Sequence, residues 1–300
     1  MQQSGLENKV RQVVSNIHNL PTPPIVFHQI QKVINQHNTS AGQIAAVLQE
    51  DPAMSVKVLK LTNSAFYGLT REVDSVKQAV VIVGLEAIKN LVLSASVLEM
   101  FKGKEIDEEY QGQFWRHSLA TAFCGRLMAR SWRNSGIVDP DAAFSAGLLH
   151  DIGKMIISCF LSDEFKLLKS ARSENPGLSD YVLEEQVLGY NHSQIGGFLA
   201  VQWKLPPKLG DAITNHHNPT HSLGGNPLAY IIHVADIVSR RTFNDTFENS
   251  ALDPMPEALD FLAVSAEDVI SFEDKLREEY VKAETFMAMA GISSGSAAGG

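Results

Sequence analysis

Histidine and aspartate side chains recur through the second half of the chain in an order that suits a metal site. Seven of the ten histidines lie between residues 117 and 233. The candidate ligands, in chain order, are His117, His150, Asp151, His192, His216, His217 and Asp236. Imidazole nitrogen with carboxylate oxygen suits Zn, Fe, Mn, Co or Ni better than Ca or Mg. These residue types therefore predict a site for a divalent transition metal.

The surroundings of these residues are more informative than the dipeptides themselves. Ten His and fifteen Asp in 300 residues give about half of one His-Asp pair by chance. His150 and Asp151, however, interrupt the apolar run Gly-Leu-Leu-His-Asp-Ile-Gly-Lys, and Asp236 interrupts a second one. A polar group buried without a partner costs about 2–7 kcal/mol. A metal ion would be one partner for Asp and His together.

Single candidates also have structural interpretations. Alone, His117 would be a packed core histidine, and Asp236 would pair with Arg240 four residues later on a helix. His192 alone would begin a helix after Asn191 as the N-cap. Taken together in this order, the residues favour the metal interpretation.

Neighbouring residues are interpreted in the same way. His216 and His217 alone would be a surface pair at a helix end, where the helix dipole favours an imidazolium. We expect His221 and His233 to be structural. Lys154, one turn after His150 on the same helix face, could neutralise a phosphate. The alternative for Lys154 is a solvated cation near the middle of a helix.

Capping patterns predict that helices hold these side chains. Capping boxes are expected at Ser40-Ala-Gly-Gln43 and Ser75-Val-Lys-Gln78. An N-cap followed by proline occurs at Asp51-Pro52, Asp139-Pro140 and Asn226-Pro227, and helix ends are expected at Gly84 and Gly103. The β-branched run at 80–83 lies inside a capped helical pattern. The chain is therefore predicted to be all-α, and a helical bundle lets distant ligands converge on one interior point.

Composition narrows the class of protein. A chain of 300 residues with 44% apolar residues allows one large domain or two packed ones. The net charge of −9 argues against binding to DNA or to an anionic membrane. Two cysteines, Cys124 and Cys159, indicate a reducing compartment, and the first residues have no apolar signal core. We expect a cytoplasmic protein without a membrane span.

The order His, His-Asp, His, His-His, Asp resembles the HD superfamily of metal-dependent phosphohydrolases. Within it, the layout is similar to the HDOD family, the HD-related output domains of bacterial signalling proteins. The N-terminal half agrees through Leu20-Pro-Thr-Pro-Pro24, Asp51-Pro-Ala-Met54, Leu59 to Gly68 and Ala79 to Leu85. The resemblance covers about residues 15–240. It implies an all-α fold in which a helical N-terminal subdomain packs on an HD-like helical bundle core.

The resemblance and a polar segment at 102–110 suggest the domain limits. We expect an N-terminal helical HDOD subdomain at 15–102 and an HD-like metal-site core at 103–245. Residues 246–300 should form a C-terminal amphipathic helix, from about Ala266 to Ala290, and a flexible small-residue tail. Residues 15–240 should form one HDOD unit.

Two functions are implied. The preferred one is a bacterial signal-transduction module that acts through a signalling protein partner or a nucleotide or phosphate ligand, with a structural or regulatory metal. A homodimer is compatible with it, and neither a DNA nor a membrane partner is expected. The alternative is a metal-dependent phosphohydrolase, a phosphodiesterase or nucleotidase-like enzyme, with Asp151 and Lys154 as catalytic residues.

The resemblance also implies how the ligands would be shared. His117, His150, Asp151 and Asp236 would hold one ion, and Asp151, His192, His216 and His217 a second, with Asp151 bridging. One or two ions are expected, with Fe or Mn preferred to Zn or Ni. A metal-bound water would be the nucleophile of the enzyme.

The HD-GYP cyclic-di-GMP phosphodiesterases have a similar ligand order but a different following segment. Their Gly-Tyr-Pro signature is missing here, because Asn218-Pro-Thr-His follows the His-His pair. Cyclic-di-GMP hydrolysis is therefore not expected. The Glu that some of them use one turn before the first His is replaced by neutral Gln113, which weakens the case for a third metal.

Overall fold

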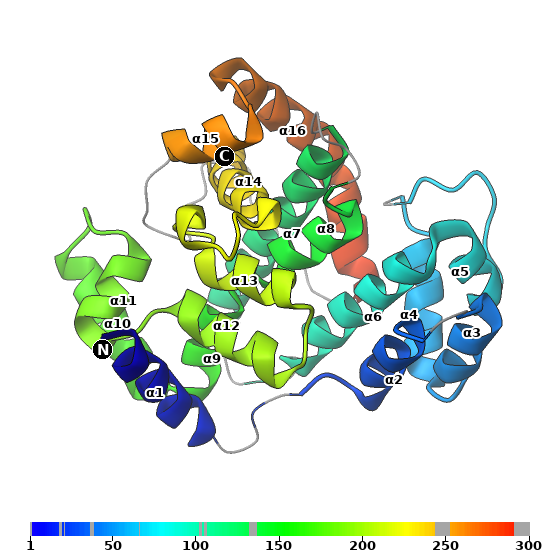
Figure 1. The fold of residues 1–300 in the computed structure, drawn as a ribbon, viewed down its shortest axis with the longest axis horizontal. Coiled ribbons are helices and arrows are strands. Elements are labelled where there is room, and N and C mark those ends of the chain that lie inside the picture. The colour runs from blue at the N-terminus through cyan, green and yellow to red at the C-terminus, as the bar shows by residue number, and fades with distance from the viewer. Residues whose placement is uncertain are drawn as a thin grey trace. The chain divides into compact units, whose positions relative to one another are not determined.

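The computed structural model describes residues 2–17, 20, 22–36, 39–65, 67–101, 104, 107–131, 137–243 and 253–290. Every regular element in these residues is a helix, as Figure 1 shows, so the all-α prediction is confirmed. The chain divides into two compact units. Unit 1 comprises Met1–Leu20 and Lys104–Glu278, and unit 2 comprises Pro21–Gly103 and Glu279–Gly300. The predicted helix end at Gly103 and the predicted tail at 291–300 lie outside the described residues.

Unit 2 contains a set of helices, and those that begin at residues 41, 52 and 76 follow the predicted N-caps. The helices of this unit are α2 (Ile25–Ile34), α3 (Ala41–Gln49), α4 (Pro52–Thr62), α5 (Val76–Val83) and α6 (Leu85–Met100). The capping box of Ser40 forms completely, and the Asp51 carboxylate accepts from the backbone N–H of Met54. Gly84, with φ +94°, ends α5 and precedes α6. The predicted helix over the β-branched run 80–83 is confirmed.

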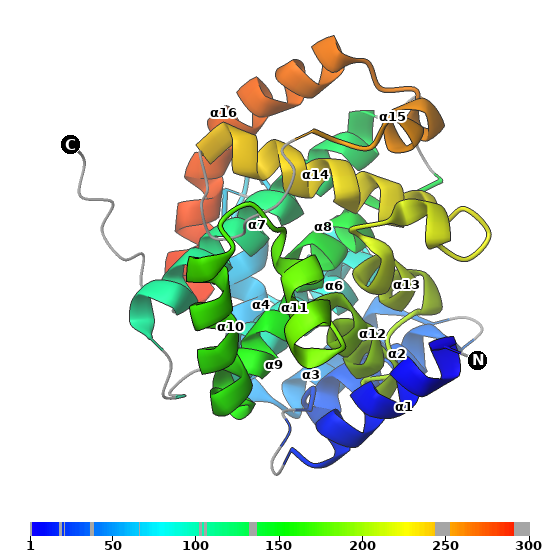
Figure 2. The ribbon, with the colours of Figure 1, turned by 90° about the vertical axis from the view of Figure 1, so that its left-hand side faces the viewer.

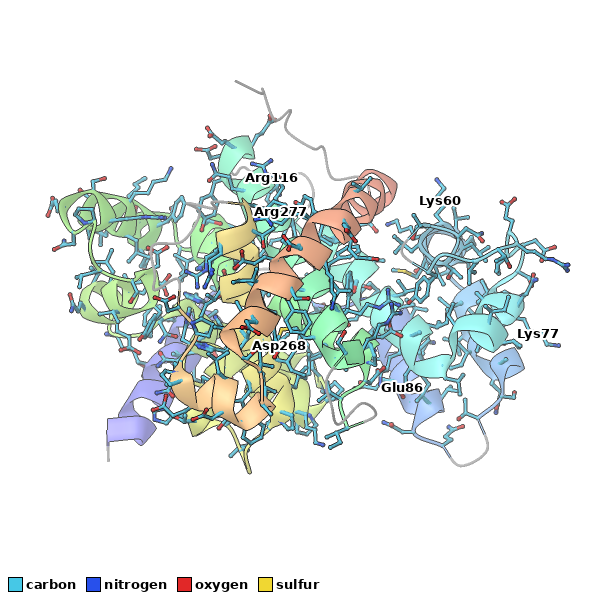
Figure 3. All side chains as sticks on the ribbon, turned by 90° about the horizontal axis from the view of Figure 1, so that it is seen from above. Lys60, Lys77, Glu86, Arg116, Asp268 and Arg277 are labelled. Carbon is cyan, nitrogen blue, oxygen red and sulfur yellow. The ribbon has the colours of Figure 1, made fainter. Side chains whose placement is uncertain are left out.

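One predicted cap forms only in part. The Ser75 hydroxyl accepts from the backbone N–H of Gln78, but the Gln78 side chain accepts from the backbone N–H of Asp74 instead of Ser75. The reciprocal half of the predicted box is therefore wrong. Charged side chains of the unit, such as Lys60 and Lys77, point outward (Figure 3).

Unit 1 contains the segment Lys104–Glu278 together with the first helix. Its elements are α1 (Gln2–Ser15), α7 (Glu108–Ser131), α8 (Pro140–Leu149), α9 (Ile152–Phe160), α10 (Ser162–Glu174), α11 (Asp180–Leu188), α12 (His192–Gln202), α13 (Pro207–Asn215), η1 (Pro219–His221), α14 (Pro227–Phe243), α15 (Pro256–Leu262) and the first part of α16 (Ala266–Ala290). Helix α7 packs against α8 and α14, and α12 packs against α9, α13 and α1 (Figures 1 and 2).

Helix α7 is the central helix of unit 1. Its side chains are buried almost continuously from Phe114 to Ala129. Helix α8 lies directly on α7 at Gly147, where a Cβ would come 2.6 Å from Cα of Ala122. Helix α8 begins as predicted, with the Asp139 carboxylate accepting from the first backbone N–H groups. The close approach brings the end of α8, where the His-Asp pair lies, to the middle of α7.

Among the described residues, the stretch Pro140–Phe160 is long and apolar enough to cross a membrane by composition, and 89% of its apolar 18-residue window is buried. Helices α5 and α6 pass the same test only as a pair that is bent by 117°. Core helices of a compact unit meet the same criteria.

Candidate metal centre

The seven predicted ligands come from five regions of unit 1. His117 lies in α7, His150 and Asp151 join α8 to α9, His192 begins α12, His216 and His217 follow α13, and Asp236 lies in α14. All are buried except His217, which is partly exposed. The predicted ligands, which lie far apart in the sequence, therefore converge in one interior region of unit 1.

The first group surrounds one oxygen of Asp151. Nε2 of His117 lies 3.2 Å from Nε2 of His150 and 3.7 Å from Oδ2 of Asp151. Nε2 of His150 lies 3.4 Å from the same Oδ2. These three residues have ligand atoms within 4.8 Å of one another, which is the arrangement that a single cation requires.

The second group surrounds the other oxygen of Asp151. Oδ1 lies 3.0 Å from Nε2 of His192 and 3.6 Å from Nε2 of His216. Nε2 of His217 lies 2.9 Å from Nε2 of His192. The ligand atoms of these four residues also lie within 4.8 Å of one another. Because each oxygen of Asp151 faces a different group, this carboxylate is placed to bridge two ions.

Asp236 belongs to neither group. Arg240 donates to both of its carboxylate oxygens at 3.0 Å, as the structural interpretation expected. Its Oδ1 also lies 3.2 Å from Nε2 of His117. Burial would raise the pKa of Asp236, but Arg240 and His117 outweigh it and hold the pKa well below its usual range. Asp236 thus contacts the cluster only through His117 among the predicted ligands, and Arg240 fixes the position of its carboxylate.

The hydrogen bonds of two imidazoles fix which nitrogen faces the cluster. Nδ1 of His150 donates to the carbonyl of Gly147 at 2.7 Å, and Nδ1 of His216 donates to the carbonyl of Ile213 at 2.8 Å. A carbonyl only accepts, so these Nδ1 atoms carry hydrogen and the Nε2 atoms of the neutral rings present lone pairs. An outer hydrogen bond of this kind orients metal-ligating histidines in proteins.

Two buried atoms of the cluster test whether the site suits a cation. Among the described residues, neither Oδ1 of Asp151 nor Nε2 of His216 makes a hydrogen bond. Nε2 of His192 lies 3.0 Å from that oxygen, but not in hydrogen-bond geometry. Buried polar atoms nearly always have a partner. A metal ion would satisfy both atoms, so the donor set fits a metal.

Electrostatics separate the histidines into neutral and charged ones. Burial lowers the pKa of His150 to about 4, and it also lowers the pKa of His217 well below its ordinary value. Burial would lower the pKa of His192 too, but the carboxylates of Glu184 and Asp151 outweigh it and raise that pKa to about 10. His192 is therefore the imidazole that must lose a proton when a metal binds.

Lys154 is not a solvated cation, so that alternative is wrong. Its side chain is 4% exposed, and Nζ lies 2.7 Å from Oδ2 of Asp151. Burial would raise the pKa of Asp151, but His150, Lys154 and His192 together hold it well below its usual range. Lys154 thus stabilises the carboxylate at the centre of the cluster.

Sequence reasoning missed Glu184, on α11. Its Oε2 accepts from both Nδ1 and the backbone N–H of His192, each at 2.7 Å, and the residue is buried. In the sequence, Glu-Glu-Gln looks like a solvated helix face. One sequence signal near Glu184 was available, the predicted N-cap at Asn191. The structure confirms this cap, which places a polar group beside the turn from α11.

His233 holds the end of α13, which agrees with its predicted structural role. It accepts at Nε2 from the backbone N–H of Met255 at 3.0 Å, so Nδ1 carries hydrogen and donates to the carbonyl of His216 at 2.8 Å. Outside this network, the ring of Tyr181 stacks on His217 with centroids 4.4 Å apart.

Gly153 sets the distance between α9 and α12. A Cβ at this position would lie 2.0 Å from the carbonyl oxygen of His192 and 2.9 Å from its Cα. Real Cβ atoms do not come this close, so only glycine fits here. The contact places Asp151 and His192 next to each other across the two helix starts.

A model of the HDOD domain family matches residues 20–219. The chain belongs to the HDOD family. A protein of Treponema pallidum (strain Nichols), named only as uncharacterized, is 24% identical over 210 residues. The match covers 70% of this chain but 40% of that relative, so the chain spans less than half of the relative's length.

Solved structures share the fold of this HDOD chain. An HDOD domain protein of unknown function from Geobacter sulfurreducens has a TM-score of 0.78 at 23% identity, covering 97% of this chain and 99% of its own. A candidate phosphohydrolase from Shewanella amazonensis SB2B has a TM-score of 0.72 at 23% identity, covering 95% and 97%. A candidate signal transduction protein from Marinobacter aquaeolei VT8 has a TM-score of 0.77 at 21% identity, covering 97% and 66%. At these identities the likeness shows the fold alone.

Proposed function

We propose that this HDOD chain is a bacterial signal-transduction module in which a buried metal holds the helices of unit 1 in their binding-competent arrangement. The observation that supports this function best is the burial of the ligand set. His150, Asp151, His192 and His216 are each 0% exposed. Structural metal sites are closed by protein ligands, whereas catalytic sites keep a position open for water or substrate.

The proposed site would hold one or two divalent ions. His117, His150 and Asp151 would hold one, with Asp236 steadying His117, and Asp151, His192, His216 and His217 would hold the other. Nitrogen and carboxylate ligands without thiolate suit Fe or Mn, which we propose ahead of Zn or Ni. The module would act in the cytoplasm by binding a signalling protein or a nucleotide or phosphate ligand.

Metal analysis of the full chain purified without chelator tests this function. The wild-type chain should contain a stoichiometric transition metal, and Asp151→Ala should lose it. Asp163→Ala is the matched control, because that carboxylate is 89% exposed on α10 and pairs with Lys166, away from the cluster. A wild-type content below about 0.2 ion per chain would contradict the proposal, since a structural site is occupied when the protein folds.

A metal-dependent phosphohydrolase is the second candidate, and the position of Lys154 favours it. Its ammonium lies 2.7 Å from the proposed bridging carboxylate and lines a cavity beside the cluster. Bound metal would supply an ionised water and neutralise phosphoryl oxygens. In this chain, Asp151 would hold the metals and Lys154 would orient an anionic substrate.

Turnover separates the two candidates. The metal-loaded chain would be assayed with nitrophenyl phosphates, nucleotides and cyclic dinucleotides, with Asp151→Ala in parallel. Hydrolysis that Asp151→Ala abolishes would establish the enzyme, and hydrolysis that survives belongs to a contaminant. The signalling module instead predicts no turnover and a specific protein partner recovered by pull-down.

A further inference from the structure

Unit 1 contains a cavity of about 430 Å³ between the start of α7 and helices α9, α10 and α11. Figure 2 shows the three later helices side by side. Small-molecule sites are usually about 300–1,000 Å³. None of the seven candidate metal ligands lines this cavity. It is therefore a separate compartment next to the cluster.

The inner wall of the cavity is formed by the residues that hold two metal ligands. Lys154 contacts Oδ2 of Asp151 at 2.7 Å, and Glu184 contacts Nδ1 of His192 at 2.7 Å. Both Lys154 and Glu184 line the cavity and are buried. A molecule in the cavity that contacts Lys154 or Glu184 would thus be linked through that side chain to Asp151 or His192.

The outer wall offers two cations on one helix. Lys169 and Arg172 lie three residues apart on α10 and both line the cavity. The Lys169–Asp107 pair is 3.7 Å long with side chains 57% and 52% exposed, and the Arg172–Asp180 pair is 3.4 Å long. The exposed Lys169–Asp107 pair contributes little, so an anion can replace the Asp107 carboxylate, whereas Asp180, with a side chain 12% exposed, stays beside Arg172. A phosphate held between the two walls would meet the guanidinium of Arg172 and the ammonium groups of Lys169 and Lys154.

The remaining wall suits a planar, partly apolar body. The rings of Tyr110 and Phe165 pack edge to face with centroids 5.0 Å apart, and both line the cavity. Leu168 and Leu183 add apolar surface. The Glu184 carboxylate can accept from hydroxyl or amino groups of a ligand.

We propose that this cavity binds a small organic phosphate with a planar ring, of the size of a nucleoside monophosphate, and that its occupancy raises the metal affinity of the adjoining cluster. The coupling rests on the proposed metal-containing function. Lys154 competes with a metal for Oδ2 of Asp151, so a phosphate that draws Lys154 away frees this oxygen for the ion. Because such coupling is reciprocal, metal raises the ligand affinity by the same factor.

Calorimetric titration of the full chain tests the cavity. Metal-free and Mn²⁺-loaded protein would be titrated with AMP, GMP, CMP and UMP, and with adenosine and inorganic phosphate as partial ligands. We expect at least one mononucleotide to bind more than tenfold tighter than either partial ligand, and Mn²⁺ to tighten it further. No binding by any mononucleotide at millimolar concentration would overturn the assignment.

A pair of variants on α10 locates the binding. Lys169→Ala combined with Arg172→Ala should weaken mononucleotide binding more than tenfold and leave Mn²⁺ binding unchanged. Lys166→Ala, on the same helix but outside the lining, should leave both unchanged. Equal weakening by Lys166→Ala would overturn the location. If the chain binds no Mn²⁺, the metal function and the coupling fail, while mononucleotide binding by metal-free protein still decides the cavity.

Discussion

Glu184 is the side chain that orients His192. Its carboxylate accepts from the ring and from the backbone N–H of that residue, inside the protein. Outer partners of metal ligands typically change metal affinity by about 10–100-fold. We therefore expect Glu184→Gln to weaken metal binding by about that factor without unfolding the chain, measured by competition with a chelator.

The matched control is Glu185→Gln, one position along α11. Glu185 contacts the capping residues Asn191 and Gln194 rather than the His192 ring. The metal affinity of the Glu185→Gln variant should stay within about twofold of that of the wild-type chain. Equal affinities for Glu184→Gln and wild type would show that the Glu184 contact does not position a ligand.

Metal binding should release a proton from His192. The pKa of His192 is about 10 in the metal-free protein, above its ordinary value, so the ring is charged at neutral pH. A ligand Nε2 must be deprotonated, so affinity should rise about tenfold per pH unit from pH 7 and level off near pH 10. Calorimetry in buffers of different ionisation enthalpy counts the protons, and Glu184→Gln should reduce the release. A release of zero at pH 7 would contradict this assignment.

Residue types and their order were enough to find the candidate ligands and the partner of Asp236, Arg240, but not the other partners. His117, His150 and Asp151 stand out because they interrupt apolar helices. Glu184 does not, because a charged residue on a helix is ordinary at a surface, and the sequence predicts a phosphate or solvent beside Lys154 rather than a contact with Asp151. Only the packing of α9 and α11 against α12 shows that both are buried beside the cluster.

At the scale of elements, the contact between α9 and α12 depends on Gly153. A methyl group there would overlap the His192 carbonyl, so the two helix starts must separate. Overpacking of this kind typically costs about 1–3 kcal/mol. We expect Gly153→Ala to lower the unfolding free energy by at least that amount and to lose the metal, measured by urea unfolding and metal analysis.

A second glycine provides the comparison. At Gly177, between α10 and α11, a Cβ would meet no atom within 4 Å, so Gly177→Ala should keep both stability and metal. If Gly153→Ala binds metal as tightly as Gly177→Ala does, then the helix spacing does not determine the site.

Helix starts were predictable because capping is local. The box at Ser40 and the N-caps at Asp51 and Asp139 involve residues two or three positions apart, which the sequence displays directly. The partial box at Ser75 shows the limit, since Gln78 can reach two neighbouring backbone groups. Contacts between helices, such as Gly147 on Ala122, have no such local signal.

At the scale of the molecule, all candidate ligands belong to unit 1. Metal at a hundred times its Kd stabilises the folded state that binds it by about 2.7 kcal/mol. Amides of unit 1 that exchange through unfolding should therefore exchange about a hundredfold more slowly with metal. Residues 22–101 should be unaffected. Hydrogen exchange with mass spectrometry checks this, and equal slowing in both units would show that they unfold together.

The amphipathic C-terminal helix was predictable from its pattern. Helix α16 has the predicted range Ala266–Ala290, and Asp268 and Arg277 lie on its exposed side (Figure 3). The place of α1 was not predictable. Val10 and Val14 are buried, and α1 packs against α12, but an apolar stripe does not name its partner.

The packing of α1 on α12 has a consequence for synthesis on the ribosome. The two helices are separated by nearly the whole of unit 2 and much of unit 1. At about 5–20 residues per second, α1 waits roughly ten to forty seconds for its partner. Val10 and Val14 face water or a chaperone during that time, while unit 2 residues 22–101 emerge and can fold. Helix α1 is therefore buried only after α12 has been made, and it closes over the helix that holds His192.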